Sequence, residues 1–210
     1  MTAELVFYTN PMSRGRIVRW MLEEIGAPYR TELQGFGGPK SPAILAVNPM
    51  GKVPAITHGD VVVTECAAIC AYLADAFPEA GLAPPLGDRG AYYRWLFFAA
   101  GPVEAAITNK ALGFEVPPER EGMAGYGNVA RVIDVLETAV ADTDFIAGGA
   151  FSAADVYFGS QIGWGMQFGS IERRPAFERY WSRLAERPAA IRAREIDDAL
   201  IAATSTPAPG

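Results

Sequence analysis

One stretch of the chain encodes a β-hairpin and the helix that follows it: NPMGKVPAITHGDVVVTECAAICAYLADAF, residues 48–77. Two short apolar runs, 55–57 and 61–63, flank a Gly-Asp turn signal, and this pattern is typical of a hairpin. In the residues that follow, apolar side chains recur at the 3.6-residue spacing of a helix with one buried face. We therefore predict two antiparallel strands that lead directly into a helix.

Two positions in this stretch have the chemistry of a ligand site. Pro54 stands at the start of a predicted strand, where it removes a backbone donor and where a cis peptide is permitted. The N–H and C=O of Val53 are then free to pair with an extended ligand, as an added strand pairs with a sheet edge. Glu65 offers a carboxylate to a cation at a helix start, whose own free N–H groups attract an anion. Such a stretch can hold the amine, the carboxylate and the peptide backbone of an amino-acid-like ligand.

A resemblance to a known family lies in two segments, NPMGKVPAI (48–56) and VVTECAAICAYL (62–73). They resemble the glutathione-binding half of the glutathione S-transferases, whose usual form is N-P-x-G-K-V-P, a hairpin, and E-S-x-A-I-x-x-Y-L. Cys66 stands where the family usually has serine. The resemblance implies a glutathione-binding set made of Lys52, Val53, Pro54, Glu65 and Cys66. The alternative is a hairpin and helix that bind nothing.

The N-terminal part of the chain has the element order of a thioredoxin-like fold. We expect a buried strand at 5–8, a helix at 14–25 closed by a Gly26 C-cap, a strand at 27–33 and a short helix or turn at 41–47. A β-α-β order implies a right-handed crossover and parallel strands. With Pro54 before the third strand, this order matches the thioredoxin-like fold.

The second half of the chain is expected to be helical. Residues 78–88 are rich in proline and glycine and are predicted to form a linker. The helices predicted after it are a long one at 89–112, one at 125–141, one beginning after Ser152, and one or two within 175–194; residues 202–210 are expected to be a frayed tail. We predict an α/β thioredoxin-like domain at 1–80, a linker at 81–87 and an all-α domain at 88–205, which is the glutathione S-transferase fold.

A capping box with a hydrophobic staple is encoded at Phe151–Val156. Ser152 is placed to cap the N–H of Asp155, whose carboxylate can reach back, and Phe151 is expected to pack on Val156. This S-x-x-D signal resembles the capping box of the family's helical domain. We interpret it as a folding element and not as a catalytic one.

Ser13 is the candidate catalytic residue. It follows the first predicted strand and precedes the first predicted helix, and in the theta- and delta-like classes of the family a serine at this point donates a hydrogen bond to the glutathione sulfur. The beta-like class has cysteine here. Asn10 and Tyr8 are alternative donors, and a plain helix cap is the non-catalytic alternative for Ser13.

Several cations are candidates for binding anionic groups. The resemblance places Lys52 at the glycyl carboxylate of glutathione, and Lys40 is a second candidate in the loop before it. Either Arg14 or Arg16 could hold a negative charge of the substrate, or both could simply be solvated.

The composition restricts the partners and the compartment. The chain has 210 residues, 50% of them hydrophobic and 20% charged, and its net charge of −6 does not favour nucleic acid or acidic membranes. Two cysteines, Cys66 and Cys70, lie four apart on one predicted helix, and one histidine is present, so we expect no disulfide and no metal. The first ten residues contain no predicted signal peptide and no membrane span. We expect a cytoplasmic protein.

The resemblance implies a function and a partner. We expect a homodimeric glutathione transferase that uses glutathione as a co-substrate and conjugates it to a small hydrophobic electrophile. The alternatives are a non-catalytic glutathione-binding or stress-response protein and another glutathione-dependent reaction, such as isomerisation, reduction or dehalogenation.

Overall fold

The computed structural model describes residues 3–205, which form two compact units. The first unit combines the chain up to Ala80 with the segment from Glu186 onward, and the second runs from Gly81 to Ala185. This division differs from the predicted one at the C-terminal end, because the last helix packs with the N-terminal part of the chain. Residues 206–210 of the predicted frayed tail lie outside the described residues, and residues before them continue the last helix to Ser205.

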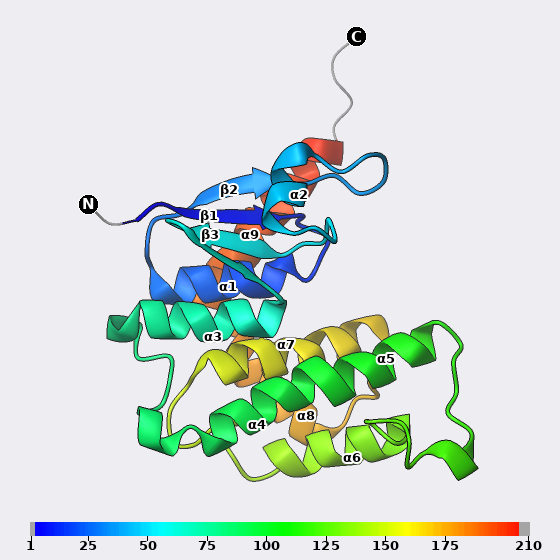
Figure 1. Ribbon diagram of the computed structural model, residues 1–210. Coiled ribbons are helices and arrows are strands. Elements are labelled where there is room, and N and C mark those ends of the chain that lie inside the picture. Colours follow the sequence, from blue (N-terminus) through cyan, green and yellow to red (C-terminus); the bar gives the residue numbers. More distant parts are fainter. Residues whose placement is uncertain (1–2, 206–210) are drawn as a thin grey trace. The chain divides into compact units, whose positions relative to one another are not determined.

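A four-stranded mixed sheet forms the centre of the first unit (Figure 1). Its strands are β1 (Leu5–Thr9), β2 (Arg30–Leu33), β3 (Ala55–His58) and β4 (Val61–Thr64), in the order β2-β1-β3-β4. β1 and β2 are parallel, whereas β3 is antiparallel to both β1 and β4. The parallel β-α-β unit and the hairpin are therefore both as predicted.

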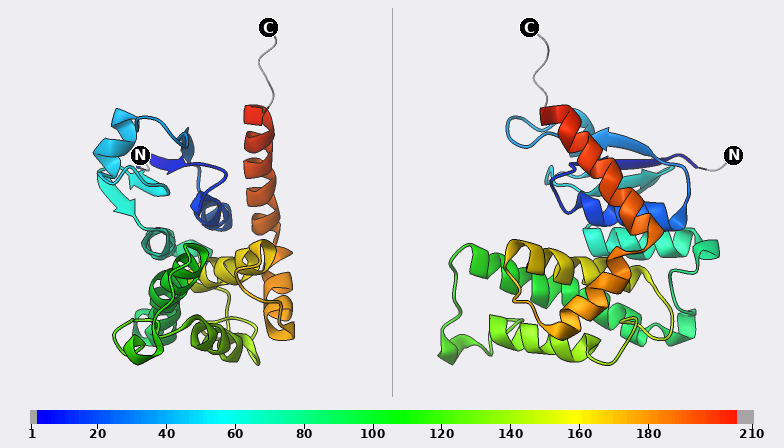
Figure 2. Two further views of the ribbon diagram at one scale, coloured as in Figure 1. Left: turned by 90° about the vertical axis from the view of Figure 1, so that its right-hand side faces the viewer. Right: turned by 180° about the vertical axis from the view of Figure 1, so that it is seen from behind.

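The helices of this unit are α1 (Gly15–Ile25), α2 (Pro42–Val47), α3 (Cys66–Ala76) and α9 (Pro188–Ser205), with a 3₁₀ turn η1 at Pro78–Ala80. α1 and α3 pack side by side against one face of the sheet (Figure 1), and α9 packs against α1 and crosses it obliquely (Figure 2). Gly26 ends α1 in the left-handed conformation, with its N–H bonded to the Leu22 carbonyl, as the predicted C-cap requires. The core side chains between these layers are Phe7, Ile17, Val18, Met21, Leu22, Ile56, Ile69 and Leu73.

The second unit is helical, as predicted. Its elements are η2 (Leu86–Asp88), α4 (Gly90–Phe98), η3 (Ala99–Val103), α5 (Glu104–Ala111), η4 (Pro118–Arg120), α6 (Val129–Val140), α7 (Ala153–Phe168) and α8 (Pro175–Ala185). Together with the mixed sheet of the first unit, these helices confirm the predicted fold class. The predicted end of the last helices at Arg194 is wrong, because α9 continues beyond it.

The long helix predicted at 89–112 is interrupted by a π-helical turn. The turn η3 contains Pro102, which has no N–H to donate. In a regular α-helix its ring would clash with the backbone carbonyl of the preceding turn. A π turn widens the helix locally, so α4 can continue into α5 past the proline without ending.

α7 is the central helix of the second unit and packs against α4 and α8. Glycines allow α8 to approach it closely. A Cβ added at Gly163 would lie 2.5 Å from the Trp181 ring, and one added at Gly159 would lie 2.4 Å from the Leu184 side chain. The absence of side chains at these positions therefore fixes how near the two helices lie.

Asp155 at the start of α7 forms the predicted capping box and extends it. Its carboxylate accepts hydrogen bonds from the N–H and hydroxyl of Ser152 (2.9 and 3.0 Å), the N–H of Ile146 (2.7 Å) and the hydroxyl of Tyr180 (2.8 Å). The group is completely buried, and burial raises the pKa of its carboxyl while these four donors oppose the rise. Asp155 thus joins the helix start, the preceding loop and α8.

Among the described helices, none is both long and apolar enough to cross a membrane.

We predict that Asp155→Asn lowers the free energy of unfolding by about 2–5 kcal/mol. An amide provides one acceptor oxygen in place of two, so at least two buried donors lose their acceptor at about 1–3 kcal/mol each. Urea denaturation of the variant measures this, with the exposed Asp142→Asn as a control that should stay within about 0.5 kcal/mol of wild type. Equal midpoints for Asp155→Asn and Asp142→Asn would show that the carboxylate does not hold this part of the fold.

Candidate active site

The strand register brings three loops to one end of the sheet. Tyr8 pairs with Ala55, and Ala55 pairs in turn with Thr64. Because β3 runs opposite to both neighbours, the segment after β1, the segment before β3 and the residue after β4 leave the sheet at the same end. These are the segments that contain Ser13, Val53 with Pro54, and Glu65.

Asn10 shapes the first of these loops. Its side-chain N–H₂ donates to the Gln34 carbonyl at 2.7 Å, and its side-chain oxygen accepts from the Met12 N–H at 2.8 Å. The Gln34 N–H in turn donates to the Thr9 carbonyl at 2.7 Å, so the end of β2 is fixed to the end of β1. The side chain of Asn10 is therefore engaged in building the loop.

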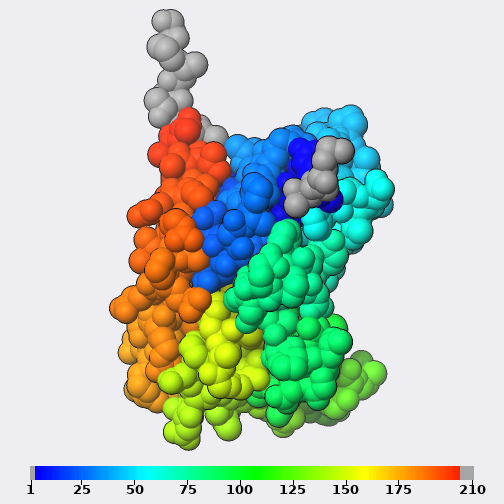
Figure 3. Space-filling view, turned by 90° about the vertical axis from the view of Figure 1, so that its left-hand side faces the viewer, coloured from blue at the N-terminus to red at the C-terminus, as the bar shows by residue number. Residues whose placement is uncertain are grey.

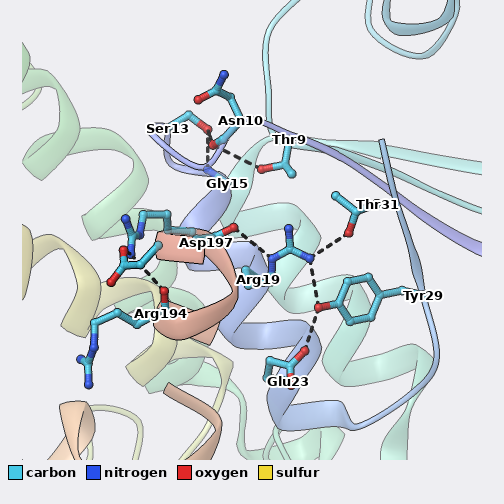
Figure 4. Close-up of polar contacts among 12 residues, drawn as sticks. Thr9, Asn10, Ser13, Gly15, Arg19, Glu23, Tyr29, Thr31, Arg194 and Asp197 are labelled. Atoms are coloured by element: carbon cyan, nitrogen blue, oxygen red, sulfur yellow. Dashed lines mark hydrogen bonds and ion pairs between the residues drawn. The ribbon is translucent and has the colours of Figure 1, made fainter. Parts of the chain in front are cut away.

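The Ser13 hydroxyl lies within this loop, just before α1 (Figure 4). It donates to the Asn10 carbonyl at 2.7 Å and accepts from the Gly15 N–H at 3.0 Å. The same carbonyl also accepts the Ser13 N–H at 3.0 Å and faces the Thr9 hydroxyl at 3.5 Å. The hydroxyl oxygen is thus held in place by a backbone donor, while its proton is bonded to a carbonyl that has other donors.

Gly15 permits this arrangement because it has no side chain. A Cβ at this position would lie 1.9 Å from the Thr9 hydroxyl oxygen and 3.0 Å from that of Ser13. Any larger residue would move the start of α1 away from β1, together with the loop that contains Ser13.

The segment before β3 ends in a cis Val53–Pro54 peptide. Val53 lies outside the sheet pairing, because β3 begins at Ala55. Buried Asn48 organises this segment: its side chain donates to the Lys52 carbonyl at 3.0 Å and accepts from the Met50 N–H at 3.1 Å. Sequence reasoning did not assign this role to Asn48, although the Asn-Pro pair was a signal for a turn.

Glu65 immediately precedes α3 and has an unusual backbone. Its φ is +66°, and no other non-glycine residue among residues 3–205 has a positive φ. Its side chain is exposed and makes no capping hydrogen bond to the helix. A non-glycine residue in such a conformation is sterically disfavoured, and residues of this kind cluster at functional sites.

Cys66 joins the start of α3 to the start of α1. Its side chain is buried, and its sulfur lies 3.7 Å from the Arg14 carbonyl oxygen. This contact brings the residue after Ser13 next to the residue after Glu65. Cys66 and Cys70 are both free thiols.

The candidate cations occupy different environments. Lys52 and Lys40 are exposed, and the Lys40 side chain packs on Gly51, since a Cβ added at Gly51 would lie 2.9 Å from it. Arg16 forms an ion pair with Asp198 of α9, so its charge is already paired. No group of three or more His, Cys, Asp or Glu side chains within the described part of the chain is arranged to hold a metal ion.

The chain matches known proteins over both halves. Residues 12–76 match the family model described as "Glutathione S-transferase, N-terminal domain", and residues 102–188 match "Glutathione S-transferase, C-terminal domain". Glutathione S-transferase GstA of Escherichia coli O157:H7 is 30% identical over 164 residues, which cover 75% of this chain and 76% of the relative. Glutathione S-transferase A of Pleuronectes platessa is 29% identical over 172 residues, which cover 76% of each chain.

Solved structures agree with these matches. A sphingomonad glutathione S-transferase complexed with glutathione has a TM-score of 0.75 and 30% identity, covering 92% of this chain and 98% of its own. A glutathione transferase from Methylococcus capsulatus strain Bath has a TM-score of 0.76 and 29% identity, covering 93% and 99%. Both halves of the sequence are matched in order, and the fold agrees over nearly the whole length. The chain therefore belongs to the glutathione S-transferase family.

Proposed function

We propose that this protein binds glutathione at the end of the sheet where Ser13, Val53 and Glu65 meet, and transfers it to a small hydrophobic electrophile. The observation that carries the proposal is the register that brings these three segments together. Family membership supports the use of glutathione, as does the glutathione complex of the sphingomonad relative.

In this proposal the backbone of glutathione binds beside Val53. The N–H and C=O of Val53 are not used by the sheet, so they are available to an extended peptide that pairs like an additional strand. Lys52, the residue before Val53, is exposed, and its ammonium would pair with the glycyl carboxylate.

The γ-glutamyl end is assigned to the start of α3. The exposed carboxylate of Glu65 would bind the amine, and the N–H groups at the beginning of the helix, from Cys66 onward, would bind the carboxylate. The positive φ of Glu65 supports this assignment, because a disfavoured backbone persists only where the surroundings impose it.

Ser13 would activate the thiol by donating a hydrogen bond to the glutathione sulfur. For this the hydroxyl turns away from the Asn10 carbonyl, which keeps the Ser13 N–H as a donor. The hydrogen bond favours the thiolate, so the thiol releases its proton to water. The thiolate attacks an electrophilic carbon; a C–S bond forms, and the leaving group departs with its bonding electrons. Ser13 is favoured over Asn10, whose side chain is engaged by the loop, and over Tyr8, which lies within β1.

We also propose a homodimer in the cytoplasm. The buried free thiols are compatible with a reducing compartment. On α4, Tyr93 and Phe97 lie one turn apart and are exposed, Phe97 by 72% of its surface. Exposed aromatic surface of this kind is suited to cover by a second copy.

Ser13→Ala should raise the pKa of the bound glutathione thiol by about one unit or more, since one unit corresponds to about 1.4 kcal/mol of lost thiolate stabilisation. The measurement is thiolate absorbance against pH at saturating glutathione. The titration curve of Ser13→Thr, which keeps a hydroxyl, should remain closer to that of wild type. The curve of the exposed Ser182→Ala should superimpose on that of wild type. Identical titrations for Ser13→Ala and wild type would remove Ser13 from the mechanism. A wild type without a lowered thiol pKa would favour the non-catalytic binding protein.

Glu65→Gln should weaken glutathione binding about ten- to a hundredfold, because a charged hydrogen-bond partner is worth about 1.5–3 kcal/mol. Calorimetry measures this, with the exposed Glu79→Gln as the matched control. Glu65→Gly adds a second test: glycine accepts a positive φ, so this variant should unfold no more easily than wild type, while glutathione binding weakens at least as much as in Glu65→Gln. Unchanged affinity in both Glu65 variants would refute the γ-glutamyl assignment.

Phe97→Lys should shift the protein from dimer to monomer at micromolar concentration, because it places a charge in the aromatic surface on α4. Sedimentation velocity distinguishes the two states. Phe168→Lys is the control, since Phe168 is equally exposed at the end of α7. A wild type that sediments only as a monomer contradicts the proposed dimer.

A further inference from the structure

The helix α9 comes from the far end of the chain and packs along α1 in the first unit. Their surfaces are in direct contact in the space-filling view, where α9 is orange to red and α1 is blue (Figure 3). The buried face of α9 is a stripe of small residues, Ala190 and Ala193, that is completed by Asp197, spaced three and four residues apart. An aspartate therefore occupies a position where the helix pattern calls for an apolar side chain.

Asp197 is paired with an equally buried arginine. The Arg19 side chain donates through Nε to Asp197 Oδ1 at 3.2 Å, and each residue is only 1% exposed (Figure 4). Arg19 also donates through Nη1 to the hydroxyls of Tyr29 (3.1 Å) and Thr31 (2.8 Å), and its guanidinium lies 5.0 Å from the Phe7 ring centroid. One side chain thus connects α1, both parallel strands and α9.

The pair is not arranged for maximum stability. Within the described part of the chain, Arg19 Nη2 and Asp197 Oδ2 are buried without a hydrogen-bond partner. Burial is the largest influence on the Asp197 carboxyl and raises its pKa, although the Arg19 charge opposes this. A buried ion pair can often be replaced by apolar residues without loss of stability, so its presence argues for specific geometry instead.

Three further ion pairs fix the register of α1 against α9 and the residue before it. Arg16 pairs with Asp198, Glu23 with Arg192, and Glu24 with Arg187, which immediately precedes α9, at 2.7 Å. As the residue numbers rise along α1 they fall along α9, so the helices are antiparallel. Toward the N-terminus of α1, its arginines pair with aspartates of α9. At the C-terminus of α1, its glutamates pair with arginines at the start of α9 or just before it.

The charges of α1 are opposite to those that its own dipole favours. Arg16 lies in its first turn, where the dipole favours acidic groups, and Glu23 and Glu24 lie in its last turn, where it favours basic groups. The order is explained by the partner charges on α9. A displaced α9 would leave α1 with unfavourable charges at both ends and a buried, unpaired Arg19.

The Ser13 hydroxyl is connected to this helix pair by one short path. The Arg16 N–H donates to the Ser13 carbonyl at 3.2 Å, and the Arg16 side chain bonds to Asp198 and to the Arg194 carbonyl of α9. We propose that α9 is a positioning element of the glutathione site: the buried Arg19–Asp197 pair, with Arg16–Asp198, holds α1 in the register that places the Ser13 hydroxyl. This inference rests on the proposed role of Ser13 in thiolate formation.

The test is the thiol titration of bound glutathione in full-length variants of α9. Asp197→Asn removes one charge at nearly constant shape, and the double variant Arg19→Met with Asp197→Leu removes both without changing the net charge. Glu195→Gln on the exposed face of α9 is the matched control. All variants are measured at saturating glutathione and well below their unfolding temperatures.

We expect the bound thiol in both Asp197 variants to titrate about one pH unit higher than in wild type, which is about tenfold less thiolate at neutral pH. Glu195→Gln should superimpose on wild type. The direction of the change in the thiol pKa separates positioning from a direct electrostatic effect of Arg19. In Asp197→Asn, an unpaired Arg19 cation acting alone would favour the thiolate and lower the pKa of the bound thiol. A merely structural pair would change the unfolding temperature and leave the titration unchanged.

A double variant that titrates like wild type, or a lowered pKa in Asp197→Asn, overturns the proposal. If the double variant does not fold, Asp198→Asn provides the same test, because that side chain is 58% exposed and its loss leaves the core intact. A wild type that shows no lowered thiol pKa would instead refute the proposed function, so the two failures are distinguishable.

Discussion

The antiparallel register of β3 between β1 and β4 is the constraint on which the site depends. Tyr8, Ala55 and Thr64 form one row across three strands, so the chain leaves the sheet three times at the same end. A shift of one residue would turn Phe7 and Ile56, both completely buried, toward the opposite face. The apolar core therefore fixes the register, and the register in turn assembles the loops that contain the candidate binding residues.

Features encoded by neighbouring residues could be predicted from the sequence. The hairpin followed from two apolar runs around a Gly-Asp turn, and the capping box followed from the spacing of Ser152 and Asp155, because both signals act over a few residues. The family resemblance added the grouping of Val53, Glu65 and Ser13, which no local pattern shows. Which hydroxyl or amide activates the thiol could not be decided from sequence. In the structure the Asn10 side chain and the Ser13 hydroxyl are both hydrogen-bonded within this loop, so the choice of Ser13 stays a prediction.

Features that depend on distant residues were missed for a physical reason. In the sequence, Arg16 and Glu24 are consistent with solvated side chains on a surface helix, and Asp197 is one acid among several in a charged, alanine-rich segment. These side chains form ion pairs with residues more than a hundred and fifty positions away in the sequence, and the periodicity of apolar residues does not reveal such pairs. The extension of α9 beyond Arg194 was missed likewise, because the small buried residues of that helix give a weak apolar pattern. An aspartate at a core position within such a pattern is the signal that could have indicated a buried partner.

The return of α9 to the N-terminal unit also constrains how the site is completed. Burying Arg19 without Asp197 would leave an uncompensated charge in the core, which is among the most destabilising arrangements in a protein. The strands and α1 are synthesised before Asp197, which follows Arg19 by 178 positions. Contacts of such large sequence separation form late, since the entropy of closing a long loop must be overcome before they contribute. The buried charge of Arg19 is therefore compensated only after the chain has been made as far as Asp197, and this couples the core of the first unit to a helix encoded far from its strands.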